Sequence, residues 1–457
     1  MTVLLQIGRR PPDPDPPSAP EPDPAAELRF FRSSAGTHLF VADGSRIYDL
    51  PDGVVSADLA RAMREDSTPR RIDGRPLPPP PLSALSLNVL QACNMSCGYC
   101  YADEGRFGGP ARAMSPETAR AAVDRLLAES RTGADVVVGF MGGEPLLARD
   151  LVHEVTAYAA RAAEAMGRRV RFAITTNLTT VTPQDARLFA EYSFAVSVSV
   201  DGNREQHDAV RRMRGGASSY QQMLAGLDVL RRHGRPRHLA ARITVIPRTG
   251  RLLPVLEHVL GLGFDEVGFA AVLVSPDPAL ALPADGFTTL LADVVECGEV
   301  ALAELSAGRR YPFGNFETAM HQIHRGSHRP YPCGAGAGYL SAGAGGDLFA
   351  CHRLVDDPDF AMGSVQAGPD NQARAAHLAR SHVDRIQPCR SCWARYLCGG
   401  GCYHEVRRRG RPGCDYIRGW LEFCLRAYVE LSTANPGYFL SPPPVGPSGS
   451  DPTTIAR

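Results

Sequence analysis

Six apolar segments alternate with amphipathic, helix-like segments between residues 85 and 275. The apolar segments have the length and the branched or aromatic side chains of buried strands, which predicts a parallel sheet with helices outside it. The strand-like segments are LSLNVL (85–90), DVVVGFMGG (135–143), VRFAITTN (170–177), FAVSVSVDG (194–202), ARITVIP (241–247) and DEVGFAAVL (265–273), with helices between them such as 115–130 and 220–234. We therefore expect an α/β chain built on a partial, TIM-like (β/α)6 barrel, whose chemistry lies on the loops that follow its strands.

The sequence on either side of this pattern divides into shorter units. Pro, Asp and Glu dominate the first unit, which predicts disorder, and four consecutive prolines mark a linker before the barrel. Glycine and cysteine take over beyond residue 330, so we expect bound metal rather than a large apolar core to hold that part together. The expected units are a disordered 1–27, a small β-β-α unit at 28–68, a linker at 69–84, the barrel at 85–275, a helical bridge at 276–329, the cysteine-rich domain at 330–430 and a flexible tail at 431–457.

Charge and cysteine content narrow the class of protein. The chain has 49 basic and 49 acidic residues, so no net field favours nucleic acid or an anionic membrane as a partner. It has no lysine, which excludes a Schiff-base lysine and a lysine-dependent phosphate loop. We find no secretory signal and no apolar run long enough to span a membrane, which predicts a cytoplasmic, reducing location. In that setting twelve cysteines indicate metal binding rather than disulfides.

The first cysteine cluster directly follows the first strand-like segment. Cys93, Cys97 and Cys100 have the spacing C-x3-C-x2-C. Three thiolates can hold three irons of a [4Fe–4S] cube and leave the fourth iron open to chelate a small ligand. Electron transfer into a sulfonium bound there would break a carbon–sulfur bond and release a carbon radical. A zinc site, or a fourth cysteine from elsewhere in the chain, is the alternative that this spacing leaves open.

The residues around this cluster resemble the radical SAM (S-adenosylmethionine) superfamily over about residues 82–275. The resemblance implies that the triad binds the SAM-cleaving cluster and that the ring of Tyr99 packs near the adenine. It also implies SAM contacts at the ends of the next strands, including the GGEP motif that ends at Pro145 and meets the methionine amino group. Arg211 is a candidate for the methionine carboxylate, with a solvated surface as the alternative. The implied SAM-binding positions are Gly142, Gly143, Glu144, Thr176, Asn177, Ser199, Asp201 and Arg211.

A second field of cysteines occupies residues 333–424 and contains the spacing C-x2-C-x5-C-x3-C. Zinc knuckles would explain the pairs in isolation. Together with the upstream triad, the pattern resembles the SPASM extension, which carries two auxiliary [4Fe–4S] clusters. The resemblance implies that Cys389, Cys392, Cys398 and Cys414 bind the second auxiliary cluster, and that Cys333, Cys351, Cys402 and Cys424 bind the first. Without Cys424 the first cluster would have an open iron for a substrate thiolate. Cys297 is expected to be a buried apolar residue.

Within the SPASM group the chain is most similar to thioether-forming maturases, those of ranthipeptides (SCIFF type) and of the quinohemoprotein amine dehydrogenase small subunit. The resemblance implies that it cleaves SAM reductively and joins a Cys sulfur to a carbon, with Asp or Glu as the first expectation for the acceptor. The implied partners are a precursor peptide or small protein subunit and an external electron donor of flavodoxin or ferredoxin type. Residues 28–65 are expected to dock a leader peptide or to cap the barrel. The alternatives are a C–C or C–O cross-link, formylglycine formation, and a non-enzymatic iron–sulfur electron carrier.

Overall fold

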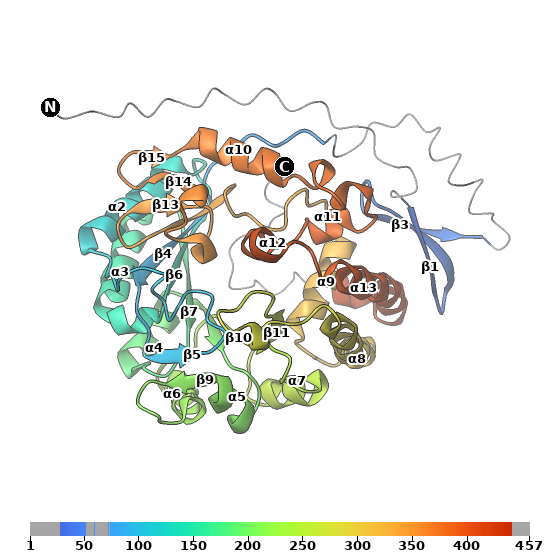
Figure 1. The fold of residues 1–457 in the computed structure, drawn as a ribbon, viewed down its shortest axis with the longest axis horizontal. Helices are drawn as coiled ribbons and strands as arrows, with labels where there is room; N and C mark the ends of the chain where they lie inside the picture. Colours follow the sequence, from blue (N-terminus) through green and yellow to red (C-terminus); the bar gives the residue numbers. More distant parts are fainter. Residues whose placement is uncertain (1–27, 52–58, 60–71, 73, 441–457) are drawn as a thin grey trace.

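A ten-stranded sheet forms the centre of the computed structural model, which describes residues 28–51, 59, 72 and 74–440 (Figure 1). Its first six strands are parallel and lie side by side in the order of the sequence. They are β4 (Ala84–Leu90), β6 (Val136–Gly142), β7 (Val170–Thr176), β8 (Ala195–Ser199), β10 (His238–Val245) and β11 (Glu266–Ala271). Each overlaps one of the six predicted segments, so the expected α/β partial barrel is confirmed.

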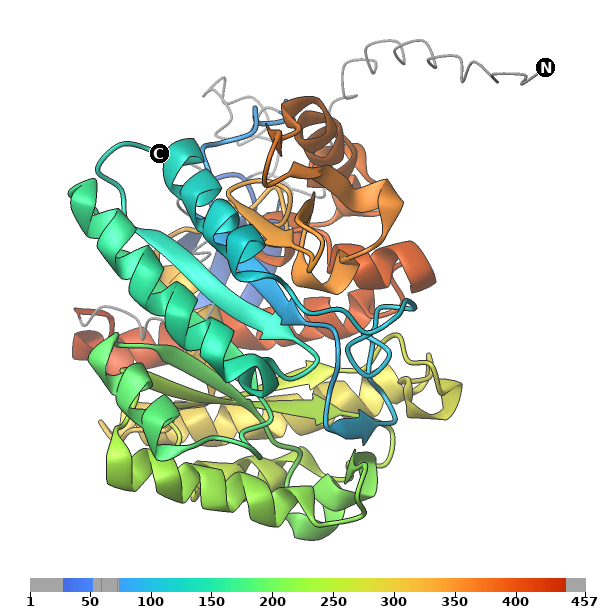
Figure 2. The ribbon, with the colours of Figure 1, turned by 90° about the vertical axis from the view of Figure 1, so that its left-hand side faces the viewer.

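Helices cover the outer face of these strands, as Figures 1 and 2 show. They include α2 (Pro116–Glu129), α3 (Arg149–Ala165), α4 (Pro183–Glu191), α6 (Ser219–His233) and α7 (Leu252–Leu260). The start of α2 is defined by Ser115, whose hydroxyl accepts the amide of Thr118, followed by a proline in the first turn. At the start of α4, Thr182 and Asp185 form a capping box. These local signals agree with the apolar periodicity. The two helices predicted at 115–130 and 220–234 form as α2 and α6.

The cysteine-rich part continues the same sheet. Strand β12 (Tyr339–Ala342) pairs in parallel with β4, and three short antiparallel strands follow, β13 (Asp347–Phe349), β14 (Ala361–Ser364) and β15 (Gly368–Pro369). Buried residues of this part, among them Leu340, Leu348 and Trp420, belong to the main hydrophobic core. The expectation that metal replaces an apolar core there is therefore wrong. The parallel strand β12 joins the new segment to the edge of β4 and buries it against the barrel.

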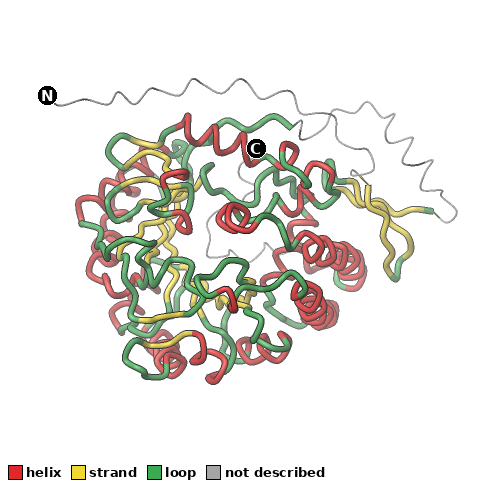
Figure 3. The backbone as a smooth tube through the Cα atoms, in the orientation of Figure 1, coloured by secondary structure: helices red, strands yellow, loops and turns green. Residues whose placement is uncertain are grey.

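Two long helices bridge the barrel and the C-terminal part. Helix α8 (Gly286–Ser306) and α9 (Gly314–His324) occupy the predicted bridge and pack against α13 (Cys414–Ala434), as the neighbouring helices of Figure 3 show. The predicted boundary at residue 430 falls inside α13. The chain then forms a short 3-10 turn at Pro436–Leu440, where Phe439 stacks on His324 with ring centroids 4.4 Å apart. The predicted flexible tail is therefore ordered as far as Leu440.

A separate three-stranded antiparallel sheet, β1-β2-β3, precedes the barrel. Its strands are β1 (Leu28–Ser33), β2 (Gly36–Val41) and β3 (Arg46–Leu50). The sequence predicts the first two strands and misses β3. The helix predicted after them, like the first 27 residues, lies almost wholly outside the described residues. The sheet attaches to α13 through an ion pair from Arg29 to Glu422 at 2.6 Å.

Candidate active site

The loop after β4 carries the first cysteine triad and folds back as a short strand. This strand, β5 (Met95–Cys97), pairs with β9 (Arg211–Met213), and the register places Cys97 opposite Arg211. The amide of Gly98 also donates to the carbonyl of Val210 at 3.2 Å. A positively charged side chain far along the sequence thereby lies beside the cysteine loop. Arg211 is 7% exposed, so its alternative interpretation as a solvated surface residue is wrong.

Cys93 and Cys97 are largely buried in this loop, and burial affects the ionisation of their thiols. Burial raises the pKa of Cys93 to about 12, with further increases from the charges of Glu144, Cys97 and Cys100. Burial likewise raises the pKa of Cys97, and Arg211 opposes it. Such thiols stay protonated until a metal displaces their protons. All twelve cysteines are free thiols. Within the described part of the chain, no three His, Cys, Asp or Glu side chains converge on a point where one metal ion would sit.

The GGEP motif packs directly on this cysteine loop. Gly143 and Glu144 donate their amides to the carbonyls of Leu90 and Ala92, at 2.9 and 3.0 Å. A Cβ atom at Gly143 would lie 2.2 Å from the carbonyl oxygen of Ala92 and 2.9 Å from the amide nitrogen of Cys93. Only glycine permits this approach. The first strand end and the second are therefore fastened together next to Cys93.

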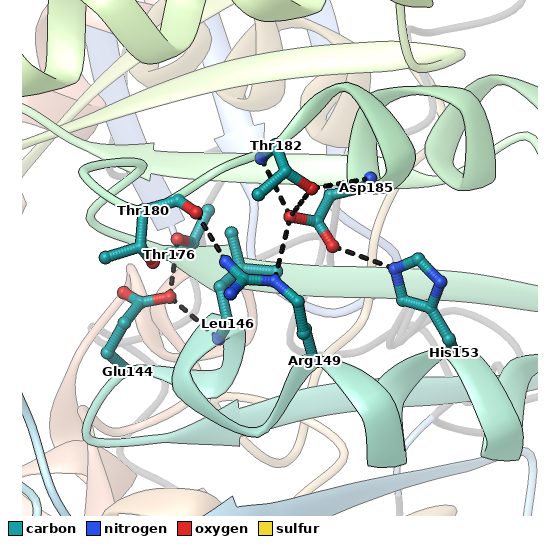
Figure 4. Close-up of polar contacts among 8 residues, drawn as sticks. All are labelled: Glu144, Leu146, Arg149, His153, Thr176, Thr180, Thr182 and Asp185. Carbon is teal, nitrogen blue, oxygen red and sulfur yellow. Dashed lines mark hydrogen bonds and ion pairs between the residues drawn. The ribbon is translucent and has the colours of Figure 1, made fainter.

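Glu144 bridges the second and third strand ends (Figure 4). One carboxylate oxygen accepts the Thr176 hydroxyl at 2.7 Å and the Leu146 amide at 3.0 Å, and the other accepts the Asn177 amide at 2.7 Å. A carboxylate offers about four acceptor positions, so one remains for a ligand such as an ammonium group. Burial raises the pKa of Glu144, and these hydrogen bonds oppose the rise. The predicted Glu144, Thr176 and Asn177 thus form one hydrogen-bonded unit.

An ion-paired cluster behind this unit fixes the helices that follow it (Figure 4). Arg149 donates to the carbonyl of Thr180 at 2.5 Å and to Asp185 at 3.4 Å. His153 contacts the other oxygen of Asp185 at 2.8 Å. The side chain of Asp185 is fully buried, so its two cationic or polar partners compensate its loss of water. The cluster ties α3 to α4 and supports the turns that carry Glu144 and Asn177.

Asn177 connects this unit to the cysteines. Its amide nitrogen lies 2.9 Å from the side-chain oxygen of Asn94 and 3.9 Å from the sulfur of Cys93. Asn94 in turn donates to Thr179 at 2.9 Å. The sequence interpretation does not include Asn94, although its place inside the C-x3-C spacing is a usable signal.

Tyr99, Asp201 and Arg211 form a buried polar network at the far side of the triad. The Tyr99 hydroxyl donates to Asp201 through a short hydrogen bond and accepts from Arg211 at 2.5 Å. Asp201 also accepts the amide of Thr244 at 2.7 Å. Its own amide donates to His207, whose pKa burial and Arg211 lower to about 3, which keeps the imidazole neutral. Resemblance assigns three of these residues, whereas Thr244 and His207 emerge only from the fold.

Ser199 is the last residue of β8 and is half-buried beside this network. The triad and most of the residues predicted to bind SAM therefore lie at the carboxyl ends of β4, β6, β7 and β8, and Arg211 reaches the triad loop from β9. A surface hollow of about 360 Å³ lies at the opposite, amino ends of the strands and contains none of them.

The later cysteines separate into two groups. In the first group, Cys333 precedes β12, Cys351 follows β13, and Cys402 caps α12 (Tyr403–Arg409). Burial raises the pKa of Cys351 to about 12, and the charges of Cys333 and Cys402 add to it. Burial and Cys402 raise the pKa of Cys333 to about 11. These three thiols are mutual neighbours, as the resemblance implies.

The second group contains four thiols in the segment from the end of α10 (Asn371–Ser381) to the first residue of α13. Burial raises the pKa of Cys389 to about 11, and the charges of Cys398, Cys414 and Cys392 add to it. Cys398 ends α11 (Arg395–Cys398), and Cys414 begins α13. The four residues that the resemblance assigns to one cluster are thus brought together, including Cys414, which only eleven residues separate from Cys402.

Cys424 belongs to neither group. It lies ten residues after Cys414 on the same helix, about 15 Å farther along the axis. Its side chain is fully buried, and burial alone raises its pKa, without a contribution from another cysteine. The structure therefore does not support its expected place in the first group. Cys297 is fully buried on α8, as predicted.

Aromatic and basic side chains fill the space between the first triad and the Cys333 group. Tyr101 directly follows Cys100, and its ring centroid lies 5.8 Å from that of His404 and 6.4 Å from that of His352. Burial raises the pKa of Tyr101, and the charges of Cys100, Cys351 and Cys402 all contribute. Tyr101 therefore lies near thiols of the first triad and of the Cys333 group. The sequence interpretation misses it, although its position beside Cys100 is informative.

Comparison with known proteins agrees with this geometry. Residues 87–251 match the model of the radical SAM superfamily. The chain is 25% identical over 379 residues to a serine-type anaerobic sulfatase-maturating enzyme of Bacteroides thetaiotaomicron, covering 75% of this chain and 88% of that protein. It is 26% identical over 349 residues to an uncharacterized protein of Archaeoglobus fulgidus, covering 73% and 78%.

Solved structures share the fold. Native anSMEcpe with bound AdoMet superposes with a TM-score of 0.66 at 18% identity, over 78% of this chain and all of that one. Streptococcus suis SuiB bound to the precursor peptide SuiA superposes with a TM-score of 0.50 at 12% identity, over 85% and 97%.

Soft thiols in groups of three and four are suitable ligands for iron–sulfur clusters. In the described residues, no helix combines the length and apolarity needed to cross a bilayer. The triad loop, the strand-end residues around it and the match over residues 87–251 lead to one conclusion: this chain contains a radical SAM domain.

Proposed function

We propose that this enzyme is a maturase that installs thioether cross-links, from a Cys sulfur to a carbon, in a ribosomally made peptide or protein. One observation carries the choice of bond: the group of Cys333, Cys351 and Cys402 contains three thiols, and Cys424 lies elsewhere. Three thiolates on a [4Fe–4S] cluster leave one iron free to bind a substrate thiolate.

The residues of the first site have distinct roles in this proposal. Cys93, Cys97 and Cys100 would hold the cluster that binds SAM, and the Arg211 guanidinium would pair with the SAM carboxylate. The last acceptor position of Glu144 suits the SAM ammonium group. When bound, these clusters supply the electron that cleaves SAM to a 5′-deoxyadenosyl radical and an acceptor for the electron released as the new bond forms. The abstracted hydrogen leaves in 5′-deoxyadenosine, and the thiol proton leaves to a base or to solvent.

The cysteines of the C-terminal part would hold two further clusters, so that the enzyme contains three. Cys389, Cys392, Cys398 and Cys414 supply a complete set of four ligands for the second auxiliary cluster. This full coordination suits electron transfer, whereas the three-thiol group suits substrate binding. The difference between four and three neighbouring thiols supports the proposal that one auxiliary cluster transfers electrons and the other binds the substrate.

A peptide substrate also suits the N-terminal sheet. In the described part of the chain, no strand pairs with the outer edge of β3, whose Tyr48 is 40% exposed. An extended leader peptide would add there as a fourth strand. An external electron donor of flavodoxin or ferredoxin type would supply the first electron, in the cytoplasm.

Formylglycine formation is the second candidate, because relatives that span three-quarters of the chain are sulfatase-maturating enzymes. Both reactions start from a side-chain hydrogen, but their products differ. A thioether removes two hydrogen atoms and one alkylatable thiol from the substrate. Formylglycine leaves an aldehyde that reacts with a hydrazide probe. A C–C or C–O cross-link removes two hydrogen atoms and leaves every thiol alkylatable.

The first experiment tests radical chemistry without a substrate. The protein is reconstituted anaerobically with iron and sulfide, mixed with SAM and dithionite, and assayed for 5′-deoxyadenosine. We expect production by the wild type and by Cys297→Ala, and none by Cys97→Ala. No production by fully reconstituted wild type would contradict the radical assignment. Small cysteine-bearing peptides encoded beside the gene are then incubated with the active enzyme and examined by mass spectrometry for the three products.

A further inference from the structure

Arg353 lies between the first cysteine triad and the group of Cys333, Cys351 and Cys402. It lies two residues after Cys351, in the 3-10 turn His352–Leu354. One guanidinium nitrogen donates to the sulfur of Cys402 at 3.5 Å and to the carboxylate of Glu405 at 2.8 Å. The guanidinium carbon lies 4.8 Å from the ring centroid of Tyr101, which follows Cys100. A single cation therefore contacts a thiol of one group and an aromatic ring beside the other.

These contacts differ from those of a surface ion pair. The side chains of Arg353 and Glu405 are 25% and 16% exposed, so both have lost much of their hydration. The buried Nε of Arg353 has no hydrogen-bond partner among the described residues. Burying a guanidinium with an unpaired N–H group costs stability, which indicates that the position serves something other than folding.

A hydrogen bond and a positive charge at a ligand sulfur affect a cluster in a known direction. Both stabilise the reduced form, which carries one more negative charge, and both therefore raise the reduction potential. Glu405 acts in the opposite direction, because its carboxylate neutralises part of the charge of Arg353. Arg353 and Glu405 are therefore expected to shift the reduction potential of the cluster in opposite directions.

We propose that Arg353 is a positioning residue that raises the reduction potential of the cluster held by Cys333, Cys351 and Cys402. The inference rests on the proposed function, because it requires that cluster. A higher potential makes the cluster a better acceptor for the electron that leaves the substrate as the new bond forms. The same side chain also packs on the ring of Tyr101, which lies between this cluster and the loop of Cys100.

The test is an EPR-monitored redox titration of the reconstituted holoenzyme. All proteins carry Cys93→Ala, Cys97→Ala and Cys100→Ala, which removes the signal of the first cluster. Into this background are placed Arg353→Gln, Glu405→Gln and the matched control Arg407→Gln. Arg407 also pairs with carboxylates and lies over a ring, that of Phe360 at 5.1 Å, but the hydrogen bonds of its guanidinium go to Asp357 and Asp359.

We expect Arg353→Gln to lower the potential of one signal by about 59 mV, a tenfold change in the ratio of reduced to oxidised cluster at fixed potential. Glu405→Gln should shift the same signal upward, and Arg407→Gln should leave it unchanged. Unshifted potentials in both Arg353→Gln and Glu405→Gln would overturn the proposal. If Arg353→Gln fails to retain the cluster, the upward shift in Glu405→Gln decides the question.

A separate measurement distinguishes this inference from the proposed function. Iron and sulfide are quantified in the background protein before and after Cys402→Ser. Loss of one cluster, with unshifted potentials in the arginine and glutamate variants, would remove only the role of Arg353. Because serine oxygen can itself bind iron, Cys402→Ala is measured as well, and unchanged iron content after Cys402→Ala would contradict the three-thiol cluster itself, and the role of Arg353 with it.

Discussion

An alanine at position 143 would place a methyl group against the backbone of the loop that carries Cys93. The new Cβ would lie 2.2 Å from the carbonyl oxygen of Ala92 and 2.4 Å from its carbonyl carbon. These are main-chain atoms and cannot rotate away, so either the loop or the GGEP turn must move. Movement would break the hydrogen bonds from Gly143 to Leu90 and from Glu144 to Ala92.

The size of the effect follows from these contacts. Overpacking a close-packed site costs about 1–3 kcal/mol. Two lost hydrogen bonds add about 0.5–1.5 kcal/mol each. We therefore expect Gly143→Ala to lower the free energy of unfolding by about 2–6 kcal/mol, estimated from these two terms. Because the displaced loop bears Cys93, SAM cleavage should fall by at least about 100-fold, since small displacements of a reacting group have effects of that order.

Gly139→Ala is the matched control. Gly139 lies on β6, the strand that ends just before Gly143, and its added Cβ would be 3.5 Å from the side chain of Ser86, an ordinary contact. Urea unfolding measures the stability of both variants, and 5′-deoxyadenosine formation after reconstitution measures their activity. Equal stability and equal SAM cleavage in Gly143→Ala and Gly139→Ala would refute the claim that this close approach holds the site.

Three further predictions concern the cysteine groups, Arg211 and Asp185. Cys402→Ala should reduce the iron content of the reconstituted protein, whereas Cys424→Ala should leave it unchanged, because Cys424 has no cysteine neighbour; iron analysis compares the two. Arg211→Lys should weaken SAM binding, measured by equilibrium dialysis, because an ammonium cannot keep the fork-like contacts of the guanidinium with Tyr99 and a carboxylate. Burial raises the pKa of Asp185, but hydrogen bonds from His153 and Thr182 and the charge of Arg149 outweigh it and lower the pKa below its ordinary value. The ionised Asp185 therefore stabilises the fold above its unfolded pKa of about 3.9, and this contribution is lost as the pH falls through the lower folded value. Asp185→Asn should therefore destabilise the protein at pH 7 and progressively less in acid. An equal loss of stability at all pH values in urea titrations would contradict this.

Local signals account for the parts of the fold that the sequence predicts correctly. Branched apolar runs define all six barrel strands, and the Ser115 cap and the apolar periodicity define α2. Strands β5 and β9 are three residues long and have no apolar pattern, so only their pairing with each other identifies them. Strand β12 lies in a glycine-rich segment and exists as a strand because β4 offers it a partner edge.

The cysteine spacing determined which chemistry to expect, and resemblance determined which thiols to group. Whether those thiols meet depends on distances that only the folded chain defines. Cys414 joins its group although only eleven residues separate it from Cys402, because the turn before α13 returns it to Cys389 and Cys398. Cys424 lies ten helical residues, about 15 Å, beyond Cys414. It is fully buried, and no charge of another cysteine contributes to the rise of its pKa, so it is not grouped with Cys333, Cys351 and Cys402 either.

The sequence by itself determined the barrel strands, the cysteine triad and the resemblance to the radical SAM superfamily, because these depend on local composition and on fixed short spacings. The tertiary structure decided the partners of those residues. It placed Arg211 opposite Cys97, gave Glu144 its three hydrogen bonds and brought Arg353 between Cys402 and Tyr101. Contacts between residues that lie far apart in the sequence follow from the packing of whole strands and helices, and no local pattern in the chain encodes them.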